Sequence, residues 1–120
     1  MIDLSDVPAD LRQAVSSALT AAGVGDGHLS VELVGPERIR ALNREHRDRD
    51  RPTDVLSFPI DGVEPVAGPR ELGDVVICPA HAEDLAEATV HGVLHLCGYD
   101  HESDGGEMEE LQASVVAGLR

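Results

Sequence analysis

Cysteine is scarce in this 120-residue chain, and long apolar runs are absent. The two cysteines, Cys78 and Cys97, form no paired-cysteine motif, so neither a disulfide framework nor a zinc knuckle is predicted. No apolar run reaches the roughly 18 residues of a membrane helix, and no basic segment followed by an apolar one begins at Met1. We therefore expect a single domain spanning residues 1–120, cytosolic, with reduced and buried thiols.

Lysine is also absent, and the formal net charge is −14, so the chain as a whole repels polyanions. All nine basic residues are arginines, and six of them lie in the window 38–51, which carries a net charge of +3. These six are Arg38, Arg40, Arg44, Arg47, Arg49 and Arg51. Two interpretations remain open: a helix face with intrahelical ion pairs, or a row of guanidinium groups that faces outward and binds phosphate.

Hydrophobic periodicity predicts helices that alternate with short strands. We expect Ser5 or Asp6 to cap a first helix that has Pro8 in its first turn and ends at Gly23. Further helices are predicted at 36–46, 82–97 and 108–115, and strands at 29–33, 53–59 and 73–79.

Three of the six histidines lie in HGVLHLCGYDH, residues 91–101. His91 and His95 are i and i+4 on a predicted helix, so both imidazoles reach one point beside its axis. Gly98 can reverse the chain without a Cβ penalty, which brings His101 back as a third nitrogen donor. Three imidazoles that leave one coordination position open are typical of catalytic zinc sites. We predict one Zn²⁺, or another late transition metal, at the end of this helix.

The other candidate ligands do not fit this site. Cys97 lies about 200° around the helix from His95, so its thiol is expected in the core. The remaining histidines are isolated in the sequence and are interpreted as ordinary surface or core residues: His28, His46 and His81.

The spacing HxxxHxxGxxH equals the metallopeptidase signature HExxHxxGxxH except at one residue. Gly92 replaces the glutamate that serves as general base in peptide hydrolysis. Asp100 and Glu102 could replace that base, but we favour a role in orienting an imidazole, or none. A metal ion that polarises a phosphoryl oxygen needs less help from a carboxylate, and nearby arginines would stabilise charge at phosphorus. The two clusters together therefore favour phosphodiester cleavage.

Three segments, HGVLHLCGYDH, LNREHRDRDRPTDVLSFP at 42–59 and LGDVVIC at 72–78, together resemble the YbeY family of bacterial metal-dependent endoribonucleases. The resemblance implies an α+β, zincin-like fold in which a small mixed β-sheet packs against helices, with the metal site at the end of a central helix. It also implies cleavage of single-stranded RNA in 16S rRNA 3′-end maturation and ribosome quality control.

The resemblance assigns roles to residues of this chain. His91, His95 and His101 match the family's metal ligands, and Arg47, in the LNxxxR segment, matches its catalytic arginine. The implied catalytic residues are thus Arg47 and His91, which would act with a zinc-activated water or a metal-polarised phosphate. The substrate-binding candidates are Arg40, Arg44, Arg49 and Arg51. The implied partners are the small ribosomal subunit, a ribosomal protein and an assembly GTPase, and an acidic body suits basic ribosomal proteins.

Two features depart from the family pattern. His46 stands where the family often has tyrosine, and the segment between Cys78 and His91 is too short for the further helix that the family usually has there. Two other functions remain open: a small zinc metallopeptidase with a relocated base, and a non-catalytic ribosome-assembly factor that uses the metal to hold its fold.

Overall fold

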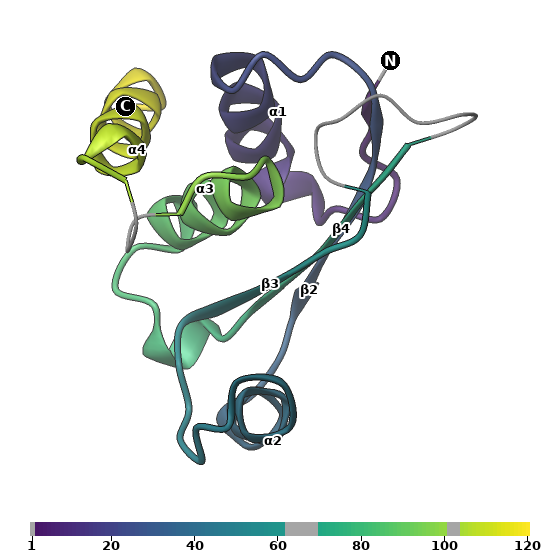
Figure 1. Cartoon of the computed structure of the whole chain (residues 1–120), viewed down its shortest axis with the longest axis vertical. Helices are drawn as coiled ribbons and strands as arrows, with labels where there is room; N and C mark the ends of the chain where they lie inside the picture. Colours follow the sequence, from purple (N-terminus) through teal and green to yellow (C-terminus); the bar gives the residue numbers. More distant parts are fainter. Residues whose placement is uncertain (1, 62–69, 101–103) are drawn as a thin grey trace.

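The computed structural model describes residues 2–61, 70–100 and 104–120, and its framework is a mixed sheet between two layers of helices (Figure 1). The strands lie in the order β1-β2-β4-β3, and their bounds are Ile2–Asp3 for β1, Gly27–Leu33 for β2, Val55–Pro59 for β3 and Glu71–Ile77 for β4. β1 and β4 run parallel to β2, whereas β3 pairs antiparallel with β4 and forms one edge. The predicted α+β fold with a small mixed sheet is confirmed.

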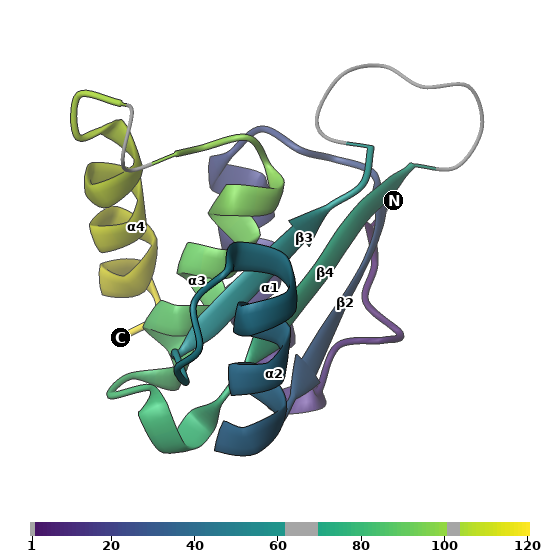
Figure 2. The ribbon, with the colours of Figure 1, turned by 60° about the horizontal axis from the view of Figure 1, so that its bottom comes forward.

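Strand β4 lies inside the sheet and has buried apolar residues on both faces, because helices cover both sides of the sheet. Val75 and Ile77 face the larger core, which is completed by helices α1 (Arg12–Ala21) and α3 (Leu85–Leu96). Val76 faces the opposite way and packs with Ile39 of helix α2 (Pro36–Arg47). Figure 2 shows α2 and α3 on the two sides of the sheet. The alternation of side chains along one strand thus separates α2 from α3.

The predicted cap of the first helix is wrong. A short 3-10 helix, η1 (Ala9–Leu11), precedes α1, and its N-cap is Pro8, with no side-chain cap. The Ser5 hydroxyl instead donates to Asp3, and the Asp6 carboxylate contacts His28. The competing partner of Asp6 is distant in sequence, so a local pattern could not reveal it.

Helix α3 ends as the sequence predicts, although it begins three residues later. Its start is capped by Asp84, whose carboxylate accepts the Glu87 N–H at 3.1 Å. At its other end Gly98 has φ +96°, and its N–H donates to the His95 carbonyl. Only the 3-10 helix η2 (Pro79–His81) connects β4 to α3, in agreement with the short spacing in the sequence.

The last helix, α4 (Glu107–Gly118), packs against α1 and α3 on the side away from the sheet (Figure 1). Its buried residues Met108, Val115 and Val116 join the larger core. None of the helices in the described ranges has the length and apolar character needed to span a bilayer.

Candidate functional site

Helix α3 brings His91 and His95 together, as their spacing predicts. The two Nε2 atoms lie 3.2 Å apart, and the ring centroids lie 4.7 Å apart. Both side chains are half-buried, whereas their helical neighbours Val93 and Leu94 are fully buried in the core. A rigid, core-packed helix therefore holds the two rings at the surface.

The Nδ1 atom of each ring contacts an oxygen acceptor. The Nδ1 of His91 lies 2.8 Å from Oε1 of Gln112, and the Nδ1 of His95 lies 2.9 Å from the Tyr99 carbonyl. The Gln112 amide is itself oriented, because its Nε2 donates to Glu87 at 3.3 Å. Both Nδ1 atoms therefore carry the proton, and both Nε2 atoms present a lone pair to the same point.

This arrangement suits a metal ion. Neutral imidazoles with Nε2 exposed and Nδ1–H bonded to an acceptor are the usual form of histidine ligands. Among the described residues, however, no group of three or more histidine, cysteine, aspartate or glutamate side chains comes together as a metal site. The predicted third ligand, His101, and the neighbouring Glu102 lie outside the described residues. The two described imidazoles thus supply a chelating pair.

Sequence reasoning missed Gln112, which lies on α4 and is distant from the histidine motif. Cys97 is confirmed as a core residue, only 6% exposed, and burial raises the pKa of its thiol to about 11. The thiol therefore stays protonated near neutral pH.

Gly92 lies where α3 approaches the sheet most closely. A Cβ atom at this position would lie 2.5 Å from Cγ1 of Val75 and 3.0 Å from Cγ2 of Val55. The Ser57 hydroxyl also donates to the Gly92 carbonyl at 2.9 Å. The glutamate of the peptidase signature would collide with β3 and β4 here, so packing explains the glycine.

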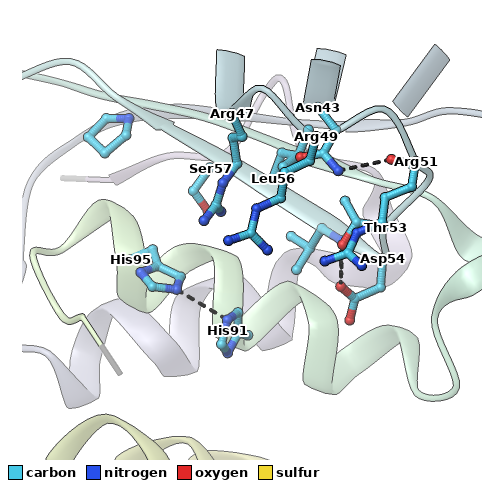
Figure 3. A pocket seen from close by; sticks show the side chains of 12 residues that line it. Asn43, Arg47, Arg49, Arg51, Thr53, Asp54, Leu56, Ser57, His91 and His95 are labelled. Atoms are coloured by element: carbon cyan, nitrogen blue, oxygen red, sulfur yellow. Dashed lines mark hydrogen bonds between the residues drawn. The ribbon is translucent and has the colours of Figure 1, made fainter. Parts of the chain in front are cut away.

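An arginine-lined cleft of about 340 Å³ lies beside the histidine pair. Arg47 at the end of α2 and Arg49 and Arg51 in the following loop line it together with His91 and His95. Figure 3 shows the side chains of Arg47 and Arg49 pointing toward the helix that carries the two histidines. The arginine and histidine clusters, separate in sequence, therefore meet in one cleft along the edge strand β3.

The other arginines of the cluster have a different environment. Arg40 binds Asp50 through two nitrogens, with Nε 2.8 Å from Oδ1, and Arg44 lies 3.7 Å from the same carboxylate. Neither Arg40 nor Arg44 lines the cleft. The hydrogen bonds to Asp50 raise the pKa of Arg40 and lower that of Asp50. Arg40 and Arg44 thus form ion pairs, but their partner Asp50 lies in the loop after α2, so these pairs are not intrahelical as expected. Phosphate binding by the cleft arginines stays a prediction.

Asn43 shapes the arginine loop and was not predicted. It is 3% exposed, and its amide donates to the Arg51 carbonyl at 2.9 Å. The backbone carbonyl of Asn43 accepts hydrogen bonds from the backbone N–H groups of Asp48 and Arg49. Asp48, at φ 56°, adopts the left-handed conformation that ends the helix. Asn43 therefore fixes the path of the loop that carries Arg49 and Arg51.

A second cavity, of about 360 Å³, lies on the other side of His91. It shares His91 and Asp54 with the arginine-lined cleft, but its other charged lining residues are acidic. These are Glu83, Asp84 and Glu87, with His81 beside them. The surface on the two sides of His91 therefore has opposite charge.

The three remaining histidines lie outside the arginine-lined cleft. The His46 ring meets Phe58 edge-on at 4.9 Å between centroids. His28 lies between two carboxylates, with Nδ1 2.6 Å from Glu71 and Nε2 2.7 Å from Asp6. His81 is exposed at the rim of the acidic cavity.

The fold and the site define an α+β protein in which paired imidazoles face an arginine-lined cleft. Residues 2–120 match the family described as Endoribonuclease YbeY, and the chain belongs to this family.

Relatives with the same description support this assignment. One from Azorhizobium caulinodans is 41% identical over 96% of this chain and 85% of its own length. One from Rubrobacter xylanophilus is 48% identical over 78% of this chain and 69% of its own. The solution structure of TM1509 from Thermotoga maritima is also similar, with a TM-score of 0.55 and 30% identity over 97% of this chain and 87% of that one.

Proposed function

We propose that the protein is a metal-dependent endoribonuclease acting on single-stranded RNA, with one zinc ion bound by His91, His95 and His101. The observation that carries this proposal is the meeting of the histidine pair with three arginines in one cleft. Membership of a family described as endoribonucleases supports the same reaction class. Residues 1–120 would form the single domain that carries the activity.

The histidine pair would hold the ion without rearrangement. The Gln112 amide and the Tyr99 carbonyl already fix the two rings with Nε2 toward a common point. When bound, a divalent ion supplies a Lewis acid that lowers the pKa of water or polarises a phosphoryl oxygen. Asp100 and Glu102, beside the ligands in sequence, would orient an imidazole or have no role in the reaction.

The arginines would bind the substrate and stabilise the transition state. Arg47, which lines the cleft with both histidines, would stabilise the charge that develops on the phosphoryl oxygens of the scissile phosphate. Arg49 and Arg51 would bind neighbouring phosphates, since guanidinium groups contact phosphate oxygens in pairs. Arg40 and Arg44, paired with Asp50, would contribute only weakly to substrate binding.

Peptide hydrolysis is disfavoured by the surroundings of Gly92. The position of the usual general base packs against Val75 and Val55, so no carboxylate can be placed there without moving the sheet.

The direct test incubates wild type, His91→Ala and Arg47→Ala with ribosomal RNA, with and without chelator. We expect wild type to cut single-stranded regions, chelator and His91→Ala to abolish cleavage, and Arg47→Ala to reduce it by about 10²-fold or more. Equal cleavage by all three proteins would reveal a contaminating nuclease and overturn the proposal.

We further propose 16S rRNA 3′-end maturation and ribosome quality control in the cytoplasm as the biological setting, with the small ribosomal subunit, a ribosomal protein and an assembly GTPase as partners. The net charge of −14 supports contact with basic ribosomal proteins. Cells that carry only the Arg47→Ala variant should accumulate unprocessed 16S 3′ ends. Normal 3′ ends in these cells, with RNA intact in vitro, would instead favour a non-catalytic assembly factor.

A further inference from the structure

The two cavities that meet at His91 differ in charge. The arginine-lined cleft carries Arg47, Arg49 and Arg51 on one side, and the acidic cavity carries Glu83 and Glu87 on the other. All five side chains belong to exposed residues. An RNA strand with its scissile phosphate at His91 would therefore meet a positive potential on one flank and a negative potential on the other.

The charges on the two sides are not neutralised by neighbours. Arg47, Arg49 and Arg51 form no ion pair within the described part of the chain, in contrast to Arg40 and Arg44. On the acidic side, Asp84 pairs with Arg120. The Glu87 carboxylate accepts the neutral Gln112 amide, and neither Glu87 nor Glu83 forms an ion pair with a described residue. Glu83 and Glu87 are therefore two carboxylates in the cavity beside His91 with no ion pair to any residue that the structure describes.

We propose that the site binds RNA phosphates on only one flank of the scissile phosphate, and that Glu83 and Glu87 repel the phosphates of the other flank. This inference rests on the proposed function and deepens it. Like charges within about 8 Å, the Debye length in physiological salt, repel without full screening. The acidic flank therefore sets the choice of bond rather than binding a ligand.

A preference for certain cleavage positions follows. A bond close to a strand end on the acidic flank has few phosphates to repel, so it is cut faster than the same bond in the middle of a long strand. An RNA strand with uncharged linkages on the acidic flank would likewise avoid this repulsion and be cut faster.

The experiment uses a single-stranded RNA with one mapped cleavage bond and two derivatives. Each derivative carries uncharged methylphosphonate linkages on one flank of that bond. We expect neutral linkages on the arginine flank to lower kcat/KM about tenfold or more. Neutral linkages on the acidic flank should raise kcat/KM by about two- to threefold at low salt. Equal losses from both flanks overturn the proposal.

Glu83→Gln is the matched protein variant. It should raise kcat/KM for the fully charged RNA by about twofold at low salt and remove most of the gain from neutral linkages on the acidic flank. Glu32→Gln is the control, because Glu32 is an exposed acid on β2 that lines neither cavity. A Glu83→Gln enzyme indistinguishable from Glu32→Gln would overturn the role of the acidic flank.

A measurement of RNA binding without cleavage tests this inference separately from the proposed function. If wild type cleaves no RNA, the proposed function fails, and fluorescence anisotropy of the intact oligomer still decides the asymmetry. Glu83→Gln must then bind the charged oligomer more tightly than wild type, while Glu32→Gln binds it as wild type does. The same affinity for all three proteins overturns the inference.

Discussion

The Nε2 atoms of His91 and His95 face each other at 3.2 Å, although each ring is held from behind by a different part of the chain. Gln112 on α4 contacts the Nδ1 of His91, and the backbone after α3 contacts the Nδ1 of His95. In the proposed metal site, these residues behind the rings would affect how tightly the ion is bound.

Gln112→Ala should weaken zinc binding about 10- to 100-fold, because His91 loses the acceptor that fixes its proton on Nδ1. A competition titration with a chromogenic chelator measures the change directly. Ser114→Ala, an exposed position on the same helix, is the control and should leave the affinity unchanged. An unaltered zinc affinity in Gln112→Ala would show that the hydrogen bond plays no part in the site.

Arg49→Ala and Arg40→Ala should differ in their effect on RNA binding. Arg49 lines the cleft, so its removal should reduce the slope of log affinity against log salt by about 0.7 for a single strand. Arg40 already binds Asp50 and lies outside the cleft, so the slope should remain that of wild type. Anisotropy titrations at several salt concentrations measure both slopes, and equal reductions would contradict this division of the arginines.

Gly92→Ala should destabilise the fold by about 1–3 kcal/mol, because its Cβ would press on Val75 at 2.5 Å. Urea unfolding measures the loss. Val75→Ala removes the colliding methyl groups, so the double variant should be more stable than the sum of the two single changes predicts. Strict additivity would mean that the helix shifts freely at this contact. Gly92→Glu should likewise fail to create a peptidase, as a casein digest would show.

The stability of the fold should fall with rising pH through His28. Its hydrogen bond with Glu71, and then that with Asp6, raise the pKa of His28 above its ordinary value of 6.5. A raised pKa in the folded state means that this contribution is complete below about pH 6.5 and is lost as pH rises through the folded value. Thermal unfolding from acidic to alkaline pH should therefore show a smaller stability difference between wild type and His28→Gln at each higher pH.

The exposed His81 offers the control for this measurement. His81→Gln should keep the pH dependence of wild type, because the His81 ring forms no hydrogen bond to a carboxylate within the ranges that the structure describes. A constant difference between wild type and His28→Gln at every pH would contradict the proposed charge on His28.

Local features of the sequence were sufficient for the main elements and for the histidine pair. The i, i+4 spacing of His91 and His95 fixes their proximity because a helix places such residues one turn apart. Gly98 ends the helix in the left-handed conformation, and Cys97 lies on the buried side, as expected. The two-residue strand β1 was too short to leave a pattern.

Contacts between distant segments decided the rest. Periodicity could not separate the arginines that form ion pairs from those that line the cleft. That separation depends on which side chains contact Asp50 and which lie in the cleft beside β3. Periodicity also could not identify Gln112, because its role depends on a contact with the His91 imidazole, 21 positions earlier in the chain. The acidic cavity, too, exists only once η2 and α3 are folded beside α4. The sequence by itself determined which groups could do the chemistry. Tertiary structure alone decided which of them share a cleft. The reason is that helix and strand periodicity predicts which face of its own element a residue lies on, but not which residues of other segments it contacts.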